Sequence, residues 1–257
     1  MTALSASFGV SKPILAMLHL KGDDPRDVLA RAMRETEILL TNGVDALVVE
    51  NYFGSRADVE AVLATLAAET LPVPFGINVL DDGRASFALA DTYGAAFVQM
   101  DSIAGHLPAD QDPGFAQSVA DLRASSSALL LGGVRFKYQP VLSGNPLDVD
   151  LQLASRRCDA VVVTGDKTGH ETSPLKIAQF RYVLGPQFPL VVGAGVTADN
   201  CHEQLLHADA AIVGSSLKDT GEASGEISPT AVAQFMDAVR QVRALVTAPT
   251  VTVGECS

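Results

Sequence analysis

The chain has 257 residues, of which 47% are hydrophobic, 19% charged and only 5% aromatic. This composition is typical of a globular protein with a sizeable core and excludes a disordered or collagen-like chain. Acidic residues outnumber basic ones by 30 to 18, which gives a net charge of -12. Because no compact basic cluster offsets this charge, the sequence disfavours nucleic acid as a partner.

Apolar stretches are short throughout the chain. None approaches the roughly 18 consecutive apolar residues that a membrane span requires, and the amino terminus lacks a basic region followed by an apolar one. We therefore expect no membrane insertion and a cytoplasmic location. The three cysteines, Cys158, Cys201 and Cys256, are widely spaced, which predicts ordinary thiols in a reducing compartment.

Eight short apolar runs rich in β-branched residues recur along the chain. They cover 14–19, 45–50, 75–80, 96–101, 128–134, 159–164, 189–194 and 210–215. Each run is apolar at both alternating sets of positions, as in a parallel strand that is covered on both faces. Segments with apolar residues at three- and four-residue spacing lie between them and predict amphipathic helices. The clearest of these segments cover 25–40, 55–68, 146–157, 173–184 and 229–244.

The spacing of the runs repeats within the chain. Runs begin at 14, 45, 75 and 96, and the pattern recurs 114 residues later, so that Asp45-Ala46-Leu47 aligns with Asp159-Ala160-Val161. Eight equivalent units favour a single (β/α)8 TIM barrel over residues 12–245. Residues 1–11 then form an N-terminal extension, and residues 246–257 are expected to be a disordered tail. The alternative fold is a doubly wound open sheet.

Loops that leave the predicted strands are longer and more polar than loops that enter them, which predicts a site at the carboxyl end of the barrel. Glycine-rich turns follow the seventh and eighth runs. Glycines allow close approach to the backbone, and a barrel commonly binds phosphate at these two loops. The alternative is that the glycines serve tight turns. The predicted phosphate-binding residues are Gly193, Gly195, Val196, Gly214, Ser215 and Ser216.

Polar residues also end most of the other strands, where side chains point into the mouth of a barrel. The candidate catalytic residues are Glu50, Asp101, Lys137 and Asp166, and the candidate substrate-binding residues are His19, Asn51, Asn78 and Thr168. Glu50 is the main candidate for a general acid or base, because partial burial would raise its pKa. Its alternative role is to cap a helix or brace a loop.

Lys137 and Asp101 each have several possible roles. Lys137 could pair with Glu50, bind an anion, form an imine or make a structural ion pair. Asp101 could be a base, a hydroxyl acceptor or a cap. The segment 164–169 lacks the spacing of a nucleotide-binding phosphate loop, but it and the segment 102–113 are candidate lids.

Metal ligation has little support in the sequence. No pair of histidines has ligand spacing, so we predict no metal site and no cofactor. A divalent metal held by Glu50, Asp101 and Asp166 remains an alternative.

Several segments, in order, are similar to the BtpA/SgcQ family of barrel proteins. They are Met17-Leu18-His19-Leu20, Gly43-Val44-Asp45 followed by Glu50-Asn51, Gly76-Ile77-Asn78-Val79-Leu80, the loop from Thr164-Gly165 to Thr168-Gly169, Gly193-Ala194-Gly195-Val196-Thr197 with Asn200, and Val213-Gly214-Ser215-Ser216-Leu217-Lys218 with Gly221. The resemblance spans roughly residues 12–243 and implies a TIM-type barrel related to phosphate-binding barrels. It implies no single reaction, because family members are associated with photosystem I biogenesis, with a sugar-utilisation gene cluster and with isomerase labels.

This chain departs from the family pattern at two places. It has Gln99-Met100-Asp101 where we expect Arg-Asn in the fourth strand, and Lys137-Tyr138 where we expect Lys-His after the fifth. If the histidine belongs to the family's chemistry, these departures predict a different substrate or a weaker activity.

These patterns lead to two main hypotheses. The first is an enzyme that acts on a small phosphorylated metabolite, a sugar phosphate or phosphoribosyl compound, as an isomerase, epimerase, lyase or glycosidic-bond-cleaving enzyme. The second is a non-catalytic assembly or stability factor for a membrane complex. A ligand sensor that uses the same pocket is a third. We also expect a homo-oligomer, the common state of soluble proteins of this kind.

Overall fold

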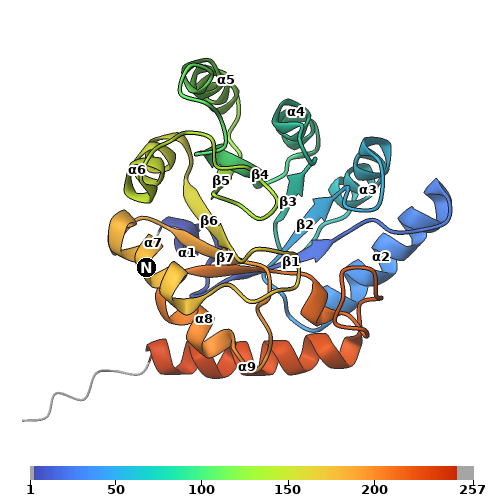
Figure 1. Ribbon diagram of the computed structural model, residues 1–257. Coiled ribbons are helices and arrows are strands. Elements are labelled where there is room, and N and C mark those ends of the chain that lie inside the picture. Colours follow the sequence, from blue (N-terminus) through green and yellow to red (C-terminus); the bar gives the residue numbers. More distant parts are fainter. Residues whose placement is uncertain (1–2, 248–257) are drawn as a thin grey trace, which may run out of the picture.

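A computed structural model describes residues 3–247 of the chain. Eight strands form a closed parallel barrel in chain order (Figure 1). The strands are β1 (Ile14–Leu18), β2 (Ala46–Glu50), β3 (Phe75–Asn78), β4 (Phe97–Ala104), β5 (Leu129–Val134), β6 (Ala160–Thr164), β7 (Leu190–Gly193) and β8 (Ala210–Val213). β1 pairs with β8 as well as with β2. This closure confirms the predicted (β/α)8 barrel and excludes the open sheet.

Helices surround the barrel (Figure 1). They are α2 (Pro25–Thr41), α3 (Arg56–Ala68), α4 (Gly83–Tyr93), α5 (Asp112–Ala124), α6 (Leu147–Arg157), α7 (Pro174–Leu184), α8 (Cys201–His207) and α9 (Pro229–Thr247). Side-chain caps fix the start of three of them: Asp24 and Asp82 each accept a backbone N–H, and Ser55 with Asp58 forms a capping box. All five of the segments with the clearest helical periodicity are helices in the structure.

The N-terminal extension includes a short helix, α1 (Ala3–Phe8). Leu4 of this helix is buried in the same apolar cluster as the residues inside the barrel. The ring of Phe8 packs edge-on against Phe97, the first residue of β4, with 5.7 Å between ring centroids. The helix therefore covers the amino-terminal end of the barrel, and the carboxyl end is left for a site.

Alternating strand residues fill the inside of the barrel. Leu15, Met17, Ala46, Val48 and Val162 belong to this inner cluster, whereas their sequence neighbours pack outward against the helices. Gly76 and Phe97 illustrate how tight this interior is: a Cβ on Gly76 would lie 2.1 Å from the Phe97 ring. The large ring on β4 occupies the space that the glycine leaves on β3.

A repeated ion-pair motif closes the amino-terminal end of the strands. An aspartate stands directly before each of β2, β6 and β8, accepts a hydrogen bond from the backbone N–H of a residue near the start of the preceding strand, and pairs with an arginine of a helix. The three pairs are Asp45 with Arg243, Asp159 with Arg123, and Asp209 with Arg181. Asp45 and Asp159 are the residues that the 114-residue repeat aligns, so the repeat has a direct counterpart in structure.

The expected domain boundaries fall close to the ends of the described chain. α9 extends to Thr247, two residues into the segment 246–257 that we expect to be a disordered tail, and the rest of that segment lies outside the described residues. Within residues 3–247, no helix is both long and apolar enough to cross a membrane.

Candidate functional site

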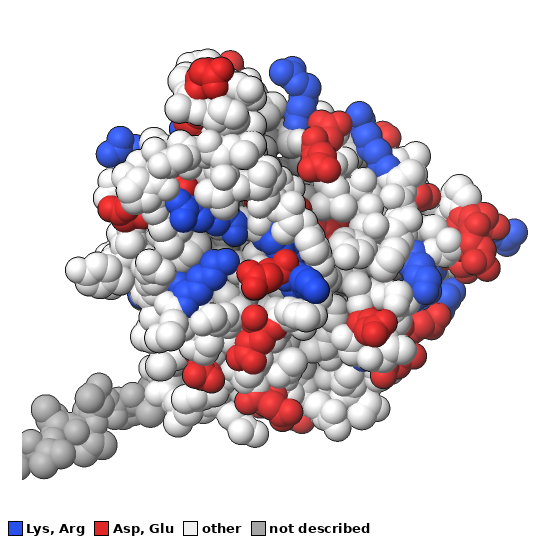
Figure 2. Space-filling view, viewed as in Figure 1, with Lys and Arg blue, Asp and Glu red and all other residues white. Residues whose placement is uncertain are grey.

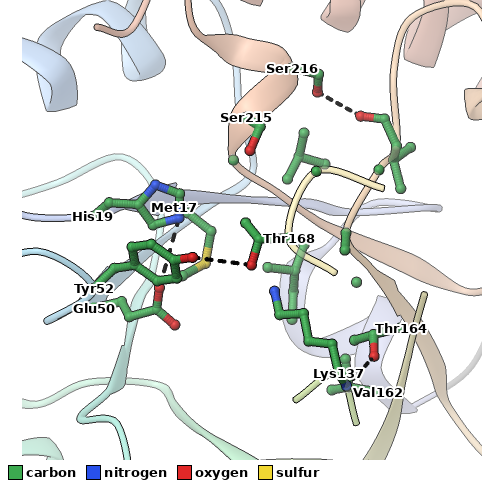
Figure 3. Close-up of a pocket in the computed structure, with 18 of the residues that line it drawn as sticks. Met17, His19, Glu50, Tyr52, Lys137, Val162, Thr164, Thr168, Ser215 and Ser216 are labelled. Atoms are coloured by element: carbon green, nitrogen blue, oxygen red, sulfur yellow. Dashed lines mark hydrogen bonds and ion pairs between the residues drawn. The ribbon is translucent and has the colours of Figure 1, made fainter. Parts of the chain in front are cut away.

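A cavity of about 150 Å³ opens at the carboxyl end of the barrel (Figure 3). Its walls come from residues of six strands and of the loops at the carboxyl end of the barrel, including the loop after β5. Ten of the predicted site residues line it: His19, Glu50, Lys137, Thr168, Gly193, Gly195, Val196, Gly214, Ser215 and Ser216. Strand alternation brings several of them together, because His19 and Glu50 have the same parity as the inner residues Met17 and Val48.

Glu50 is the buried acid of the cavity. Its side chain is 7% exposed, and Oε1 accepts a hydrogen bond of 2.8 Å from Nδ2 of Asn78. Burial, followed by the nearby charge of Asp101, raises its pKa to about 8, and these effects outweigh the opposing effects of Lys137 and the Asn78 bond. Glu50 therefore holds a proton at neutral pH and can release it close to neutrality.

His19 lies beside Glu50 in the wall of the cavity (Figure 3). Its Nε2 is 3.7 Å from Oε2 of Glu50, and its ring packs against that of Tyr52 with 5.1 Å between centroids. Burial, and next the nearby charge of Lys218, lowers the pKa of His19 to about 3. His19 is therefore a neutral imidazole in the pH range where Glu50 titrates.

Asn78 and Asp101 lie behind Glu50 and do not line this cavity. Nδ2 of Asn78 lies 3.0 Å from Oδ1 of Asp101, so this amide nitrogen donates to both carboxyl groups. Burial raises the pKa of Asp101. Both residues instead line a neighbouring cavity of about 200 Å³ between the loops that follow β3 and β4. Asn78 is placed to orient the Glu50 carboxyl group and Asp101 to raise its pKa, and neither lines the first cavity.

Lys137 follows β5 and reaches into the cavity. Its backbone N–H donates to Oγ1 of Thr164 at 2.9 Å, which fixes the start of the loop. Its side chain extends toward Thr168 (Figure 3), and Nζ lies 5.4 Å from the centre of the Phe136 ring. The chain thus places a positive charge inside a cavity that also holds Glu50.

The glycine-rich loops after β7 and β8 form the wall that faces these groups. Outside the strands, the backbone N–H groups of Gly195, Val196, Ser215 and Ser216 donate to no protein acceptor among residues 3–247. The Ser216 hydroxyl donates to the carbonyl of Val196 at 2.6 Å and ties the two loops together. This wall therefore offers N–H groups to a ligand without giving up an existing hydrogen bond.

Position 195 requires a glycine, both for its backbone conformation and for the space that its neighbours leave. Its φ is +68°, and a Cβ there would lie 2.2 Å from the backbone nitrogen of Glu171. The preceding residue, Ala194, has a φ of +75° although it is not glycine. Left-handed backbone at a non-glycine residue costs about 1–2 kcal/mol, and such strain gathers at functional sites. Here it lies in the wall of the cavity.

The loop after β6 crosses the cavity. The Tyr52 hydroxyl donates to Oγ1 of Thr168 at 3.3 Å, and the backbone N–H of Thr168 donates to the Tyr138 hydroxyl at 2.9 Å. Thr168 and Gly169 both line the cavity. The candidate lid at 164–169 is therefore held over the cavity by tyrosines from the loops after β2 and β5.

Besides Asn78 and Asp101, two further predicted residues do not line the cavity. Asn51 follows the inward-facing Glu50, and because side chains alternate it points to the other side, where Oδ1 accepts the backbone N–H of Leu80 at 2.8 Å. Asp166 stands two residues beyond the end of β6 and is exposed. Burial lowers the pKa of Lys176, and the nearby charge of Asp166 partly opposes that shift. Asn51 braces a loop, and Asp166 belongs to the surface.

The site also contains residues that the sequence analysis did not assign to it. Tyr52, Gln99 and Thr164 line the cavity. Gln99 could have been found from its parity, because it is a polar residue in an apolar strand and has the same orientation as Phe97 and Asp101. Tyr52 lies in a loop and has no comparable signal.

Outside the cavity, acidic and basic side chains are mixed on the surface. Figure 2 shows basic and acidic side chains interspersed on the face it presents, with no broad area of Lys and Arg alone among the described residues. Within residues 3–247, no group of three or more His, Cys, Asp or Glu side chains is arranged to hold a metal ion. Glu50, Asp101 and Asp166 are thus not gathered as a ligand set.

Solved structures with a similar fold include enzymes named for phosphorylated compounds. Thiamine phosphate pyrophosphorylase from Pyrococcus furiosus superposes with a TM-score of 0.61 and 14% identity, over 90% of this chain and 96% of that one. Phosphoribosyl anthranilate isomerase from Thermus thermophilus superposes with a TM-score of 0.60 and 14% identity, over 90% of this chain and 100% of that one. At this identity the likeness establishes the TIM-barrel fold.

Sequence relatives cover nearly the whole chain. A protein of Thermococcus kodakarensis is 30% identical over 90% of this chain and 97% of its own length. The photosystem I biogenesis protein BtpA of Synechocystis is 28% identical over 93% of this chain and 91% of its own length. The sgc region protein SgcQ of Escherichia coli is 26% identical over 95% of this chain and 100% of its own length. The model of the BtpA family matches residues 10–241, and this chain therefore belongs to the BtpA family.

Proposed function

We propose that this protein is an enzyme that binds a small phosphorylated metabolite in the cavity at the carboxyl end of the barrel and acts on it by acid–base chemistry. One observation carries the proposal. A single cavity has unpaired backbone N–H groups at one wall and, at another, a buried acid with a pKa near neutrality. The first suits a phosphate, and the second suits proton transfer.

The phosphate end consists of the loops after β7 and β8. The N–H groups of Gly195, Val196, Ser215 and Ser216 supply donors for phosphate oxygens, and Gly195 lets the ligand approach the backbone closely. Solved neighbours whose names refer to phosphorylated compounds share the fold. Binding energy from the phosphate would hold the rest of the ligand in position beside Glu50.

The reacting end consists of Glu50, His19 and Lys137. Protonated Glu50 would donate its proton to a ligand atom, and Lys137 would stabilise negative charge that develops on a ligand oxygen. The nearby charge of Asp101 would help to keep the pKa of Glu50 high. This arrangement suits isomerase, epimerase, lyase and glycosidic-bond-cleaving reactions. The cavity is smaller than the roughly 300 Å³ at which drug-sized pockets begin, which favours a sugar phosphate over a dinucleotide.

A thermal-shift panel tests the phosphate part of the proposal. Inorganic phosphate, pentose and hexose phosphates, phosphoribosyl compounds and nucleotides would each be added to the wild type and to Ser215→Asp, which places a negative charge in the phosphate wall. A ligand at 100 times its Kd adds about 2.7 kcal/mol to the free energy of unfolding, roughly 5–10 °C in Tm for a chain of this size.

Ser118→Asp, an exposed change of the same charge on α5, is the matched control. We expect one phosphorylated class to stabilise the wild type and Ser118→Asp but not Ser215→Asp. Failure of every phosphorylated compound to stabilise the wild type would contradict the proposal.

A second candidate function is an assembly or stability factor. It is favoured by the name of the Synechocystis relative and by two large exposed apolar side chains on α7, Leu175 (82% exposed) and Tyr182 (87% exposed). The test is whether the protein captures a membrane complex. Capture by the wild type and by Ser215→Asp, but not by the double variant Leu175→Ser/Tyr182→Ser, would support this function over the enzymatic one.

A further inference from the structure

Gln99 lines the cavity and carries a buried acceptor without a partner among residues 3–247. The residue lies in β4 and is 4% exposed, and its side chain lines the cavity together with Met17, Glu50 and Phe136. Its Nε2 donates to Oδ1 of Asp101 at 3.1 Å. Its Oε1 has no hydrogen-bond partner among residues 3–247. The amide nitrogen is therefore paired within the protein, and the amide oxygen is not.

The hydrogen bonds of Asp101 determine which atom of the Gln99 amide is paired. Oδ1 of Asp101 accepts from Nε2 of Gln99 and also from Nδ2 of Asn78, at 3.1 Å and 3.0 Å. If the Gln99 amide were turned over, its oxygen would face the carboxylate oxygen, and a hydrogen bond would be replaced by repulsion. Asp101 thus holds the nitrogen, and Oε1 is the atom left without a partner.

An unpaired buried acceptor is costly and uncommon. Leaving a buried polar group unsatisfied costs about 1–3 kcal/mol, and most buried polar atoms in native proteins have a partner. Met17 and Phe136, which also line the cavity, are apolar and supply no donor. A donor that enters the cavity with a ligand would remove this cost.

We propose that Oε1 of Gln99 accepts a hydrogen bond from a hydroxyl or amine group of the ligand, next to the atom that Glu50 protonates. Gln99 would then determine specificity: the site would select phosphate esters that carry such a donor over analogues in which it is replaced by hydrogen. This inference rests on the proposed function, since it describes the reacting end of a ligand held by its phosphate.

The inference predicts discrimination against deoxy compounds. A site built to accept a hydrogen bond rejects an analogue without the donor because the acceptor then stays unpaired. A cost of 1–3 kcal/mol corresponds to an affinity ratio of about 5- to 150-fold.

Calorimetric titration tests this with paired ligands: ribose 5-phosphate with 2-deoxyribose 5-phosphate, glucose 6-phosphate with its 2-deoxy and 3-deoxy analogues, and inorganic phosphate alone. The test variant is Gln99→Met, which keeps the length of the side chain and removes the acceptor. Gln99→Leu is a second variant in case the first does not fold, and Gln152→Met, an exposed change on α6, is the matched control.

We expect the wild type and Gln152→Met to prefer at least one hydroxylated ligand by 5-fold or more. The Gln99 variants should bind both members of that pair equally and should bind inorganic phosphate as the wild type does. The inference is overturned if the wild type shows no preference within any pair, or if the preference survives in the Gln99 variants. If inorganic phosphate and all the esters fail to bind the wild type, the proposed function itself fails.

Discussion

The carboxyl groups of Glu50 and Asp101 share one hydrogen-bond donor, since Nδ2 of Asn78 lies 2.8 Å from Oε1 of Glu50 and 3.0 Å from Oδ1 of Asp101. Only Glu50 lines the cavity at the carboxyl end of the barrel. Two buried carboxyl groups in such proximity disfavour double ionisation. Asp101 therefore contributes to the raised pKa of Glu50 without contacting the ligand space itself.

Glu50→Gln should change how stability depends on pH. Between the ordinary value of 4.5 and the raised pKa of about 8, native Glu50 holds a proton that the unfolded chain has released, so its titration lowers the free energy of unfolding as pH rises. The variant lacks this titration. The variant minus wild-type difference in free energy of unfolding should therefore increase from pH 4.5 to pH 8 and level off above it.

Urea unfolding of both chains from pH 5 to pH 9 measures that difference. His19, whose pKa is lowered to about 3, titrates in the opposite sense below its ordinary value of 6.5 and is present in both chains. Parallel stability curves for the two chains would show that Glu50 has no raised pKa.

Glu50→Gln should also separate chemistry from binding. General acid–base groups contribute typically 10²- to 10⁴-fold to a rate, so turnover of a substrate found in the ligand panel should fall by at least about 100-fold. Affinity for inorganic phosphate should stay near the wild-type value, because the loops after β7 and β8 are untouched. Glu203→Gln, an exposed change on α8, is the control. Unchanged turnover in Glu50→Gln would remove Glu50 from the mechanism.

Gly195→Ala should disrupt the phosphate wall far more than a comparable glycine change elsewhere. Both Gly195 and Gly94 have positive φ, +68° and +71°, but a Cβ on Gly195 would meet Glu171 at 2.2 Å, whereas nothing lies within 4 Å of one on Gly94. Gly94→Ala should therefore cost only the left-handed strain of about 1–2 kcal/mol. Gly195→Ala should cost more and should weaken phosphate binding, as thermal unfolding with and without phosphate would measure. Equal effects of the two changes would contradict the close approach at Gly195.

Asp159→Ala should destabilise the barrel, because it removes an ion pair and a hydrogen bond at the amino-terminal end of the strands. Asp159 accepts the backbone N–H of Leu130 at 2.8 Å and pairs with Arg123 at 2.5 Å. Hydrogen bonds to charged groups are worth about 1.5–3 kcal/mol, and we expect a loss of about 2 kcal/mol, since the pair is partly exposed. Asp121→Ala, an exposed change on α5, should stay within about 0.5 kcal/mol. A loss at Asp159 no larger than at Asp121 in urea unfolding would contradict a structural role for the motif.

Much of the fold follows from local pattern. Short runs that are apolar at both alternating positions can be stable only as strands covered on both faces, and eight of them at a spacing that repeats after 114 residues leave few arrangements other than a closed barrel. The glycine-rich turns after the seventh and eighth strands, and the polar ends of the first, second and fifth, are likewise visible in the sequence because they interrupt that pattern.

The tertiary structure decided what each of these polar residues contacts. Asn51 and Glu50 are adjacent in the chain, yet strand alternation sends Glu50 into the cavity and Asn51 to the loop after β3. The role of Gln99 depends on Asp101 of the same strand, whose carboxyl oxygen also accepts a hydrogen bond from Asn78 of β3. Sequence alone determined the periodicity and hence the barrel, because periodicity reflects burial of backbone segments. Hydrogen-bond partners and pKa values depend on distances between residues far apart in the chain, and only closure of the barrel sets those distances.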